Sequence, residues 1–375
     1  MHFIDLGIQQ DRIKKNIDNR IQKVLNHGKY IMGPEVGELE KILAKYVGVK
    51  HAIACASGTD ALFLSLLSYG IGPGDAILTS PFTFIATAEV VSILGATPVF
   101  VDVNPETFNI DPQKLNEAIR IAQSKSLKVK GIIAVDIFGL PAEYDLINEI
   151  AEANGFFVIE DAAQSLGAEY KGKKACSLAN VACTSFFPAK PLGCYGDGGM
   201  CFTNDDSLAE IIRSLLVHGK GSNKYDNIRV GVNGRLDTLQ AAILLAKFDI
   251  FPEEVGLRQQ VAQQYSELLD AYEEHRVIKP KISYGFKSAW AQYSLLTKDE
   301  EHRAVILAEL KKKDIPTAIY YPKPLHLQTA FTDLGYKSGD FPVSEDISNR
   351  VFSIPFHPYL KSEDQELIIS IINQA

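Results

Sequence analysis

The chain has 375 residues, of which 46% are apolar and 22% charged, a globular composition that excludes a disordered, collagenous or coiled-coil protein. A single hydrophobic core rarely serves more than about 250 to 300 residues, so the length predicts two domains. The 38 Lys and Arg residues are outnumbered by 46 Asp and Glu residues, which gives a net charge of −8. This charge disfavours nucleic acid and membrane surfaces as partners, because both are bound largely through basic residues.

Targeting segments and metal sites are not evident in the sequence. The longest stretch without Asp, Glu, Lys or Arg, residues 175–189, is shorter and more polar than a transmembrane helix of about 20 apolar residues. Residues 1–5 show no basic segment followed by an apolar one, so we expect no signal peptide and a cytoplasmic location. Five cysteines, with at least six residues between neighbours, fit buried thiols better than a zinc site or a disulfide framework.

From residue 51 to residue 203, short apolar strands alternate with amphipathic helices. The predicted strands span residues 51–56, 76–79, 98–103, 131–137, 156–160, 182–187 and 200–203. The predicted helices between them span residues 59–69, 84–94, 112–123 and 143–154. Near-continuous apolar strands joined by helices are typical of a mainly parallel sheet covered on both faces. The fold class predicted is therefore α/β.

The character of the chain changes near residue 250. Residues 239–248 are apolar nearly all round, which predicts a helix buried at a domain or subunit contact. A long amphipathic helix after Pro252 is followed by mixed short strands and helices. We therefore predict a large domain over residues 1–250 and a smaller C-terminal α+β domain over residues 251–375, without internal repeats.

Two short motifs lie where predicted strands end. Residues 56–62 (ASGTDAL) form a Gly-containing turn before a helix, where free backbone N–H groups and the helix dipole favour a phosphate. The same residues would also serve as an ordinary helix N-cap. Residues 158–164 (VIEDAAQ) end an apolar strand with acids, and a lone acid there could equally cap a helix. Neither motif is specific by itself.

A third motif places a lysine in uncharged surroundings. Lys190 lies between Pro188 and Pro191 in the stretch 184–196, which contains no other charged residue. Most lysines are exposed, but these neighbours suggest burial, which readily shifts the ionisation of a lysine. Lys190 is therefore a candidate Schiff-base amine. An amine, an acid at a strand end and a phosphate-binding turn are together what pyridoxal phosphate (PLP) requires for its aldehyde, its ring nitrogen and its phosphate.

In these motifs the sequence resembles the DegT/DnrJ/EryC/StrS family of sugar aminotransferases, which are fold-type I PLP enzymes. The resemblance covers nearly the whole chain and carries five segments in order. They are residues 57–59 (SGT), 81–84 (PFTF), 160–164 (EDAAQ), 185–190 (SFFPAK) and 231–237 (GVNGRLD). The resemblance implies a central sheet sandwiched by helices, and transfer of an amino group from an amino acid to a keto sugar carried by a nucleotide.

The resemblance also implies roles for individual residues. Lys190 would hold the cofactor and move the proton between substrate and cofactor, which alternates with pyridoxamine phosphate. Asp161 would pair with the ring nitrogen, and Gln164 would contact the ring hydroxyl. Phe84 would stack on the ring, although a core aromatic on a buried helix has the same spacing. The implied phosphate contacts are the turn at Gly58, Thr59 and Asp60, the Ser185 hydroxyl, and Asn233 from the neighbouring subunit of a homodimer.

The segment 186–199 is most similar to members that aminate a 3-keto UDP-N-acetyl-hexuronate, such as UDP-2-acetamido-2-deoxy-3-keto-glucuronate, for bacterial surface polysaccharide. In that subgroup the Arg of the Asn-x-Arg motif, here Arg235, reads the sugar carboxylate, which suits a guanidinium fork. An interdomain salt bridge of Arg235 with Asp237 or another acid is the competing interpretation. His326 is implied as a substrate contact and could equally be structural.

Three other functions compete with this one. A 4-keto-6-deoxyhexose aminotransferase of the same family would share every cofactor residue. A pyridoxamine-dependent sugar dehydratase would carry His at the position of Lys190. A non-catalytic PLP-binding regulator would need a DNA-binding domain, for which the chain shows neither a basic N-terminal module nor surplus length. Glutamate is the expected amino donor.

Overall fold

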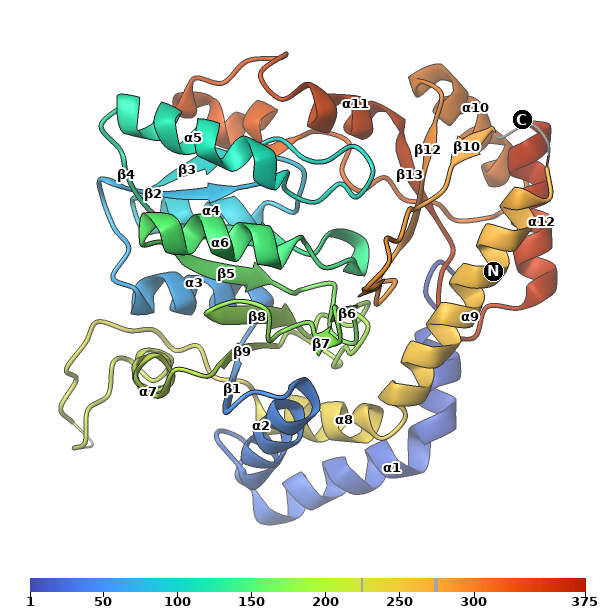
Figure 1. Cartoon of the computed structure of the whole chain (residues 1–375). Helices are drawn as coiled ribbons and strands as arrows, with labels where there is room; N and C mark the ends of the chain where they lie inside the picture. The colour runs from blue at the N-terminus through green and yellow to red at the C-terminus, as the bar shows by residue number, and fades with distance from the viewer. Residues whose placement is uncertain (224, 273–275) are drawn as a thin grey trace.

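A large sheet forms the centre of the computed structural model, which describes residues 1–223, 225–272 and 276–375 (Figure 1). In the described residues its seven strands have the order β1-β9-β8-β5-β4-β2-β3, and β9 alone runs antiparallel to its neighbours. The strands are β1 (His51–Cys55), β2 (Asp75–Thr79), β3 (Thr97–Phe100), β4 (Lys128–Val135), β5 (Phe157–Asp161), β8 (Val181–Ser185) and β9 (Gly199–Thr203). The predicted mainly parallel α/β sheet is therefore confirmed.

Helices cover both faces of this sheet. On one face lie α2 (Pro34–Val47), α5 (Pro112–Ser124), α6 (Tyr144–Asn154) and α8 (Thr238–Phe248), and on the other α3 (Gly58–Ser68), α4 (Ala86–Ile93) and α7 (Asp206–Leu215). Side chains alternate between the faces as the period of a strand requires. In β4, for example, Ile132 and Ala134 pack with α5 and α6, whereas Ile133 packs with α3 and α4.

The apolar helix α8 is buried, as its sequence predicts. It packs against α2 and against α1 (Leu6–His27), which runs beneath it in Figure 1. Ile243 and Ala246 of α8 join Ile13 and Ile17 of α1 in one apolar cluster. The small side chain of Ala246 and the branched side chains of the isoleucines fill this contact.

A second, antiparallel sheet lies beside the first. It consists of β10 (Val277–Ile278), β12 (Tyr293–Thr297) and β13 (Val351–Ile354), and it packs with α9 (Phe251–Asp270), α10 (Glu300–Lys312) and α12 (Ser362–Gln374). Helix α9 begins one residue before Pro252 because proline is tolerated in the first helical turn. The N-terminal segment reaches this region too, since Phe356 N–H donates to the Phe3 carbonyl at 3.0 Å. The domain boundary at residue 250 stays a prediction.

The remaining elements connect these layers. They are the short sheet of β6 (Glu169–Tyr170), β7 (Lys173–Lys174) and β11 (Phe286–Lys287), helix α11 (Pro342–Arg350), and the 3-10 helices Ile137–Gly139, Leu325–Leu327 and Thr329–Leu334. All five cysteines are buried free thiols, as predicted. Along the described ranges, none of the helices combines the length and apolar character that a membrane span requires.

Two predicted elements are shorter than the sequence suggested. The helix expected over residues 84–94 begins only at Ala86, and the strand expected over residues 98–103 ends at Phe100. Before α4 the chain makes a turn in which Ser80 Oγ accepts a hydrogen bond from Phe82 N–H at 3.0 Å. Phe84 therefore lies outside the helix and is 57% exposed, so the alternative of a core aromatic at this position is wrong.

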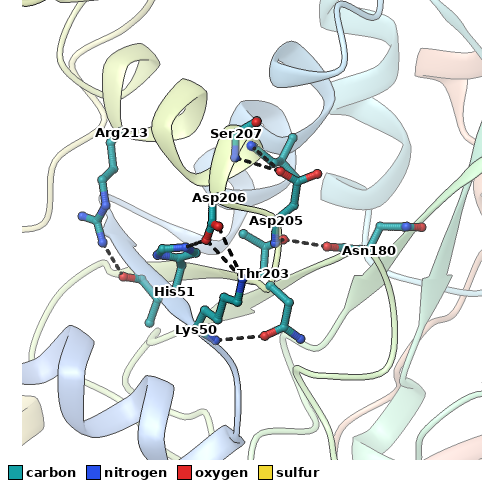
Figure 2. Close-up of polar contacts among 11 residues, drawn as sticks. Lys50, His51, Asn180, Thr203, Asp205, Asp206, Ser207 and Arg213 are labelled. Atoms are coloured by element: carbon teal, nitrogen blue, oxygen red, sulfur yellow. Dashed lines mark hydrogen bonds and ion pairs between the residues drawn. The ribbon is translucent and has the colours of Figure 1, made fainter.

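A polar cluster closes the large sheet at one end, where β1 begins and β9 ends. Figure 2 shows the Asp206 carboxylate between the Lys50 ammonium, at 3.3 Å, and the His51 ring, at 2.8 Å. Asp205 accepts the Ser207 N–H at 2.8 Å and so caps α7. Because these groups are largely exposed, they contribute little to stability. The predicted functional residues lie at the opposite end of the sheet, where the parallel strands end.

Candidate active site

The predicted functional residues meet at the carboxyl end of the large sheet. Cys55 and Ser185 end β1 and β8, and both pair in register with Gly199 at the start of β9. Asp161 ends β5, two strands along from β9. Parallel strands bring their carboxyl ends to one edge, where ligands of α/β proteins bind. Motifs far apart in sequence are thereby placed side by side.

The turn between β1 and α3 has the geometry of an anion-binding helix start. Ser57 caps α3, and its Oγ accepts the Asp60 N–H at 3.0 Å. A Cβ added to Gly58 would lie 2.7 Å from the Ser185 Cβ, so a glycine lets the turn approach the end of β8. Ser185 Oγ accepts the Phe187 N–H at 3.2 Å. The first N–H groups of α3 and the Ser185 hydroxyl are thus gathered where a phosphate was predicted, although the Asp60 N–H already donates to Ser57.

Asp161 is a buried carboxylate held by neutral donors. Its Oδ2 accepts the Thr87 hydroxyl at 2.8 Å, and its Oδ1 accepts the Ala163 N–H at 3.3 Å. Thr83 in turn lies 3.1 Å from Thr87, Oγ1 to Oγ1. Burial raises the pKa of Asp161, and the charge of nearby Lys190 partly opposes that rise. A buried acid of this kind favours a cation beside it.

Lys190 follows β8 in a loop that hydrogen-bonds to itself. The Lys190 N–H donates to the Phe187 carbonyl at 2.9 Å, and the Cys194 N–H donates to the Phe186 carbonyl at 2.8 Å. A Cβ at Gly193 would lie only 2.5 Å from the Pro188 carbonyl oxygen, which explains the glycine. Burial lowers the pKa of Lys190, while Asp161 acts in the opposite direction. A lysine with a lowered pKa is a better nucleophile and base near neutral pH.

Gln164 and Phe84 lie near a tyrosine that the sequence analysis did not assign. The Gln164 Oε1 accepts the Phe138 N–H at 2.7 Å, and its Nε2 donates to the Tyr321 hydroxyl at 3.3 Å. The exposed ring of Phe84 lies 6.4 Å from the Tyr321 ring, centroid to centroid. Burial raises the pKa of Tyr321, so its hydroxyl stays protonated. The predicted roles of Gln164 and Phe84 toward the cofactor stay predictions.

Asn233 and Arg235 lie on an extended segment beside the phosphate turn. The Gly234 carbonyl accepts the Ala56 N–H at 2.8 Å, and Arg235 bridges to Cys55. Arg235 Nε donates to Asn233 Oδ1 at 2.8 Å. Asp237 occupies the N-cap position of α8 without a side-chain cap hydrogen bond, and across the described ranges no carboxylate forms an ion pair with Arg235. The competing salt bridge with Asp237 is wrong, and the Arg235 guanidinium keeps donors for a ligand.

His326 lies in a different environment. Its ring is buried, its Nε2 lies 3.0 Å from Glu345 Oε1, and it packs edge-on against Phe341 at 4.7 Å between centroids. Burial lowers its pKa, which Glu345 partly offsets. The His326 Nδ1 has no hydrogen-bond partner in the described residues. This enclosure supports a structural role, and the substrate contact stays a prediction.

Two site residues were missed by sequence reasoning. Thr87 contacts Asp161 across 74 residues of sequence, and Tyr321 reaches Gln164 across 157. Thr87 gave one usable signal, because a threonine that a largely apolar helix buries needs a polar partner. Tyr321 gave none, since nothing local indicates which tyrosine reaches the sheet edge.

The side chains present fit PLP. Asp161 is a buried acid held by neutral donors, Lys190 is an amine with a lowered pKa, and the Ser57–Gly58 turn offers N–H groups. These three features match the ring nitrogen, the aldehyde and the phosphate, respectively. A metal centre has no such support, because no cluster of His, Cys, Asp and Glu suited to a metal occurs in the part of the chain described.

Comparison with known proteins is consistent with this geometry. Residues 11–373 match the model of the DegT/DnrJ/EryC1/StrS aminotransferase family, and the chain belongs to this family. It is 50% identical over 372 residues to UDP-2-acetamido-2-deoxy-3-oxo-D-glucuronate aminotransferase of Pseudomonas aeruginosa, covering 99% of each chain. It is also 41% identical to a pleiotropic regulatory protein of Geobacillus stearothermophilus, covering 99% of this chain and 97% of the other.

A solved structure supports the fold as well. The crystal structure of a DegT DnrJ EryC1 StrS aminotransferase from Brucella abortus matches with a TM-score of 0.95 at 49% identity, covering 100% of this chain and 99% of the other. The predicted family and the fold-type I architecture are therefore confirmed.

Proposed function

We propose that this protein is a cytoplasmic, PLP-dependent aminotransferase that transfers an amino group from glutamate to UDP-2-acetamido-2-deoxy-3-keto-glucuronate, in the biosynthesis of surface polysaccharide. The observation that carries the proposal is the meeting of Lys190, Asp161 and the Ser57–Gly58 turn at one sheet edge. The relationship to an aminotransferase of the 3-oxo uronate supports the substrate.

The residues of the chain divide the chemistry between them. When bound, PLP supplies an aldehyde for the amine and a ring that takes up the electrons of a cleaved Cα–H bond. Asp161 holds the proton on the ring nitrogen, and Thr87 orients Asp161. The Lys190 amine, with its lowered pKa, moves the proton at the substrate carbon in each half-reaction. The Ser57–Gly58 turn anchors the phosphate and so fixes the ring between these groups.

Arg235 supports the choice of a uronate. It is a cation on the extended segment beside the site, and among the described residues its guanidinium contacts only Asn233, through Nε. Its two terminal nitrogens match the fork geometry with which a guanidinium binds a carboxylate. A neutral 4-keto-6-deoxyhexose has no group that needs this fork. That hexose remains the nearest alternative substrate, because it would use the same cofactor residues.

Replacing Arg235 should separate the two substrates. Arg235→Ala should weaken use of the uronate by about 2 to 5 kcal/mol, the loss expected when a buried charged partner is truncated, and Arg235→Lys should recover it only in part. A neutral keto-hexose should be affected far less. The measurement is kcat/KM for both sugars, with the melting temperature recorded alongside and Arg120→Ala on α5 as a matched control. Equal losses for both sugars would favour the hexose.

We infer that the enzyme is a homodimer in which Asn233 serves the partner's site. Asn233 is exposed, and the same segment carries Ile228 and Val230, which are 56% and 92% exposed. In Figure 1 this segment extends away from the body of the protein after α7. Exposed apolar side chains beside a site are typical of an interface that completes it. The alternative is that Asn233 contributes to the site of its own subunit, because the neighbouring Gly234 contacts the phosphate turn of the same chain.

Mixing two inactive variants should restore activity. If sites are shared, a heterodimer of Lys190→Ala and Asn233→Asp has one site with both lesions and one with neither. Random exchange makes half of the dimers mixed, so about one quarter of the wild-type activity should return. Activity is measured after subunit exchange, and native mass spectrometry counts the heterodimers. Confirmed heterodimers without recovery would place Asn233 in its own subunit's site.

The alternative outside the enzymes is a non-catalytic PLP-binding regulator, and the similarity to a pleiotropic regulatory protein is the observation that favours it. The lowered pKa of Lys190 and the donors that the Arg235 guanidinium keeps for a ligand favour catalysis, because a regulator needs neither. Turnover of any keto nucleotide sugar by the purified protein would decide in favour of an enzyme.

A further inference from the structure

A buried group of acids lies directly behind Asp161. Asp136 follows β4, and Glu160 precedes Asp161 at the end of β5. Asp136 and Glu160 are both 0% exposed, and the Asp136 N–H donates to the Asp161 carbonyl at 3.1 Å. Within the described ranges, neither Asp136 nor Glu160 forms an ion pair with Lys, Arg or His. Several uncompensated charges in one dry region are very costly, so some of these acids must keep a proton.

Asp136 has the environment of a charged carboxylate. Its Oδ1 accepts the Ala142 N–H at 2.9 Å and the Tyr144 hydroxyl at 2.8 Å. Its Oδ2 accepts the Ser165 hydroxyl at 2.6 Å. Three donors directed at one carboxyl group stabilise its ionised form. Burial nevertheless raises the pKa of Asp136 to about 7, and these hydrogen bonds act against that rise.

Glu160 has fewer donors and a direct contact with Asp136. Its two oxygens accept the N–H groups of Cys176, at 2.5 Å, and Leu178, at 2.9 Å. Glu160 pairs in register with Ala134 of β4, two residues before Asp136, so the side chains of Glu160 and Asp136 lie at adjacent positions on the same face of the sheet and interact. Two carboxyl groups can form a hydrogen bond only when one of them carries a proton. Burial and the charge of Asp136 raise the pKa of Glu160 well above its usual range. Because Asp136 accepts three hydrogen bonds and Glu160 two, the charge is better placed on Asp136 and the proton on Glu160.

We propose that Glu160 keeps its proton at neutral pH and donates it to Asp136, so that this acid pair bears a single negative charge behind Asp161. The inference deepens the proposed function, since it rests on the role of Asp161 at the ring nitrogen. The pair acts by its position. Its fixed negative charge raises the proton affinity of the PLP ring nitrogen that Asp161 faces. The contacts of Glu160 also hold the end of β5 in place. The other titratable groups facing the pair are Asp161, Tyr144 and Cys176.

Infrared difference spectroscopy of the PLP-loaded protein tests the proton directly. At pH 7, the difference spectrum of the wild type minus Glu160→Gln should contain the C=O band of a protonated carboxyl group, because the variant lacks it, and the same band should be visible in the wild type alone. Asp145→Asn, an exposed acid on α6, is the control and should lose a carboxylate band. Loss of a carboxylate band in Glu160→Gln, or no protonated band in the wild type if that variant fails to fold, overturns the proposal.

The pH dependence of stability gives a second readout. An unfolded Glu binds its proton only below about pH 4.5, whereas folded Glu160 keeps it, so the folded state holds one more proton between about pH 4.5 and 7. Stability contributed by this group is therefore full at low pH and is lost as pH rises. Over that window the unfolding constant of the wild type should increase with pH more steeply than that of Glu160→Gln. The difference between the two slopes should be about a factor of ten per pH unit. Equal slopes would reject a retained proton.

The charge of the pair should also be visible at the cofactor. Glu160→Gln keeps the charge on Asp136 and should leave the pH titration of the bound PLP absorbance unchanged. Asp136→Asn removes the charge and should shift that titration to lower pH and reduce kcat more than KM changes. An unshifted titration in a folded Asp136→Asn protein overturns the positioning role. If the protein shows the shared proton but aminates no keto sugar, the proposed function is wrong, whereas the proposal of a proton shared by Glu160 and Asp136 stands.

Discussion

Replacing Lys190 with alanine should abolish turnover while the protein still binds PLP. General acid–base catalysis alone is worth about 10²- to 10⁴-fold in rate, and this variant loses the nucleophile in addition. Borohydride should fix the cofactor to Lys190 in the wild type and to no residue in the variant. The measurements are the rate with glutamate and keto sugar, the absorbance of bound PLP, and peptide mass spectrometry.

The control for this experiment is Lys15→Ala, which removes an exposed lysine from α1 and should leave rate and cofactor unchanged. A Lys190→Ala protein with near-normal activity would remove the mechanism altogether. Fixation of the cofactor to a different lysine would show that the loop after β8 has another function.

Asp161→Asn should lower the rate by about 10²- to 10³-fold, the size of effect seen when a preorganised electrostatic partner is removed. A neutral amide no longer favours a protonated ring nitrogen, although Thr87 can still hydrogen-bond to it. Since burial raises the pKa of Asp161, the amide should not destabilise the fold. The rate and the pH titration of the PLP absorbance are measured together.

Thr87→Val is the matched control for Asp161→Asn, because it removes the hydroxyl that orients Asp161 and leaves the charge in place. It should lower the rate by less than the loss of the carboxylate does. A full rate in Asp161→Asn with intact cofactor binding would show that another group protonates the ring.

The sequence predicts the parts of the site that depend on strand ends. Asp161 and Ser185 follow apolar strands, and the shared edge of parallel strands brings them together without any knowledge of side-chain contacts. The loop of Lys190 was recognisable because prolines and glycines surround a lone charge. These features are local, and local patterns are what a sequence shows most clearly.

The parts that sequence reasoning missed depend on contacts across the fold. His326 pairs with Glu345 only because the 3-10 helix and α11 pack together, which no spacing rule indicates. Arg235 lies two residues from both Asn233 and Asp237, so an extended segment would allow either pairing. In the structure Asn233 Oδ1 accepts the Arg235 Nε–H, whereas the Asp237 backbone bridges to Ile31 at the start of α8. Such competition is decided by tertiary structure.

The central claim is tested most directly by product analysis. The purified, PLP-loaded protein is incubated with glutamate and, in parallel, with 3-keto and 4-keto UDP and dTDP sugars, and the products are identified by mass spectrometry and NMR. The account predicts a 3-amino product from UDP-2-acetamido-2-deoxy-3-keto-glucuronate and little from the neutral sugars. Amination of a 4-keto-6-deoxyhexose without amination of the uronate would contradict it.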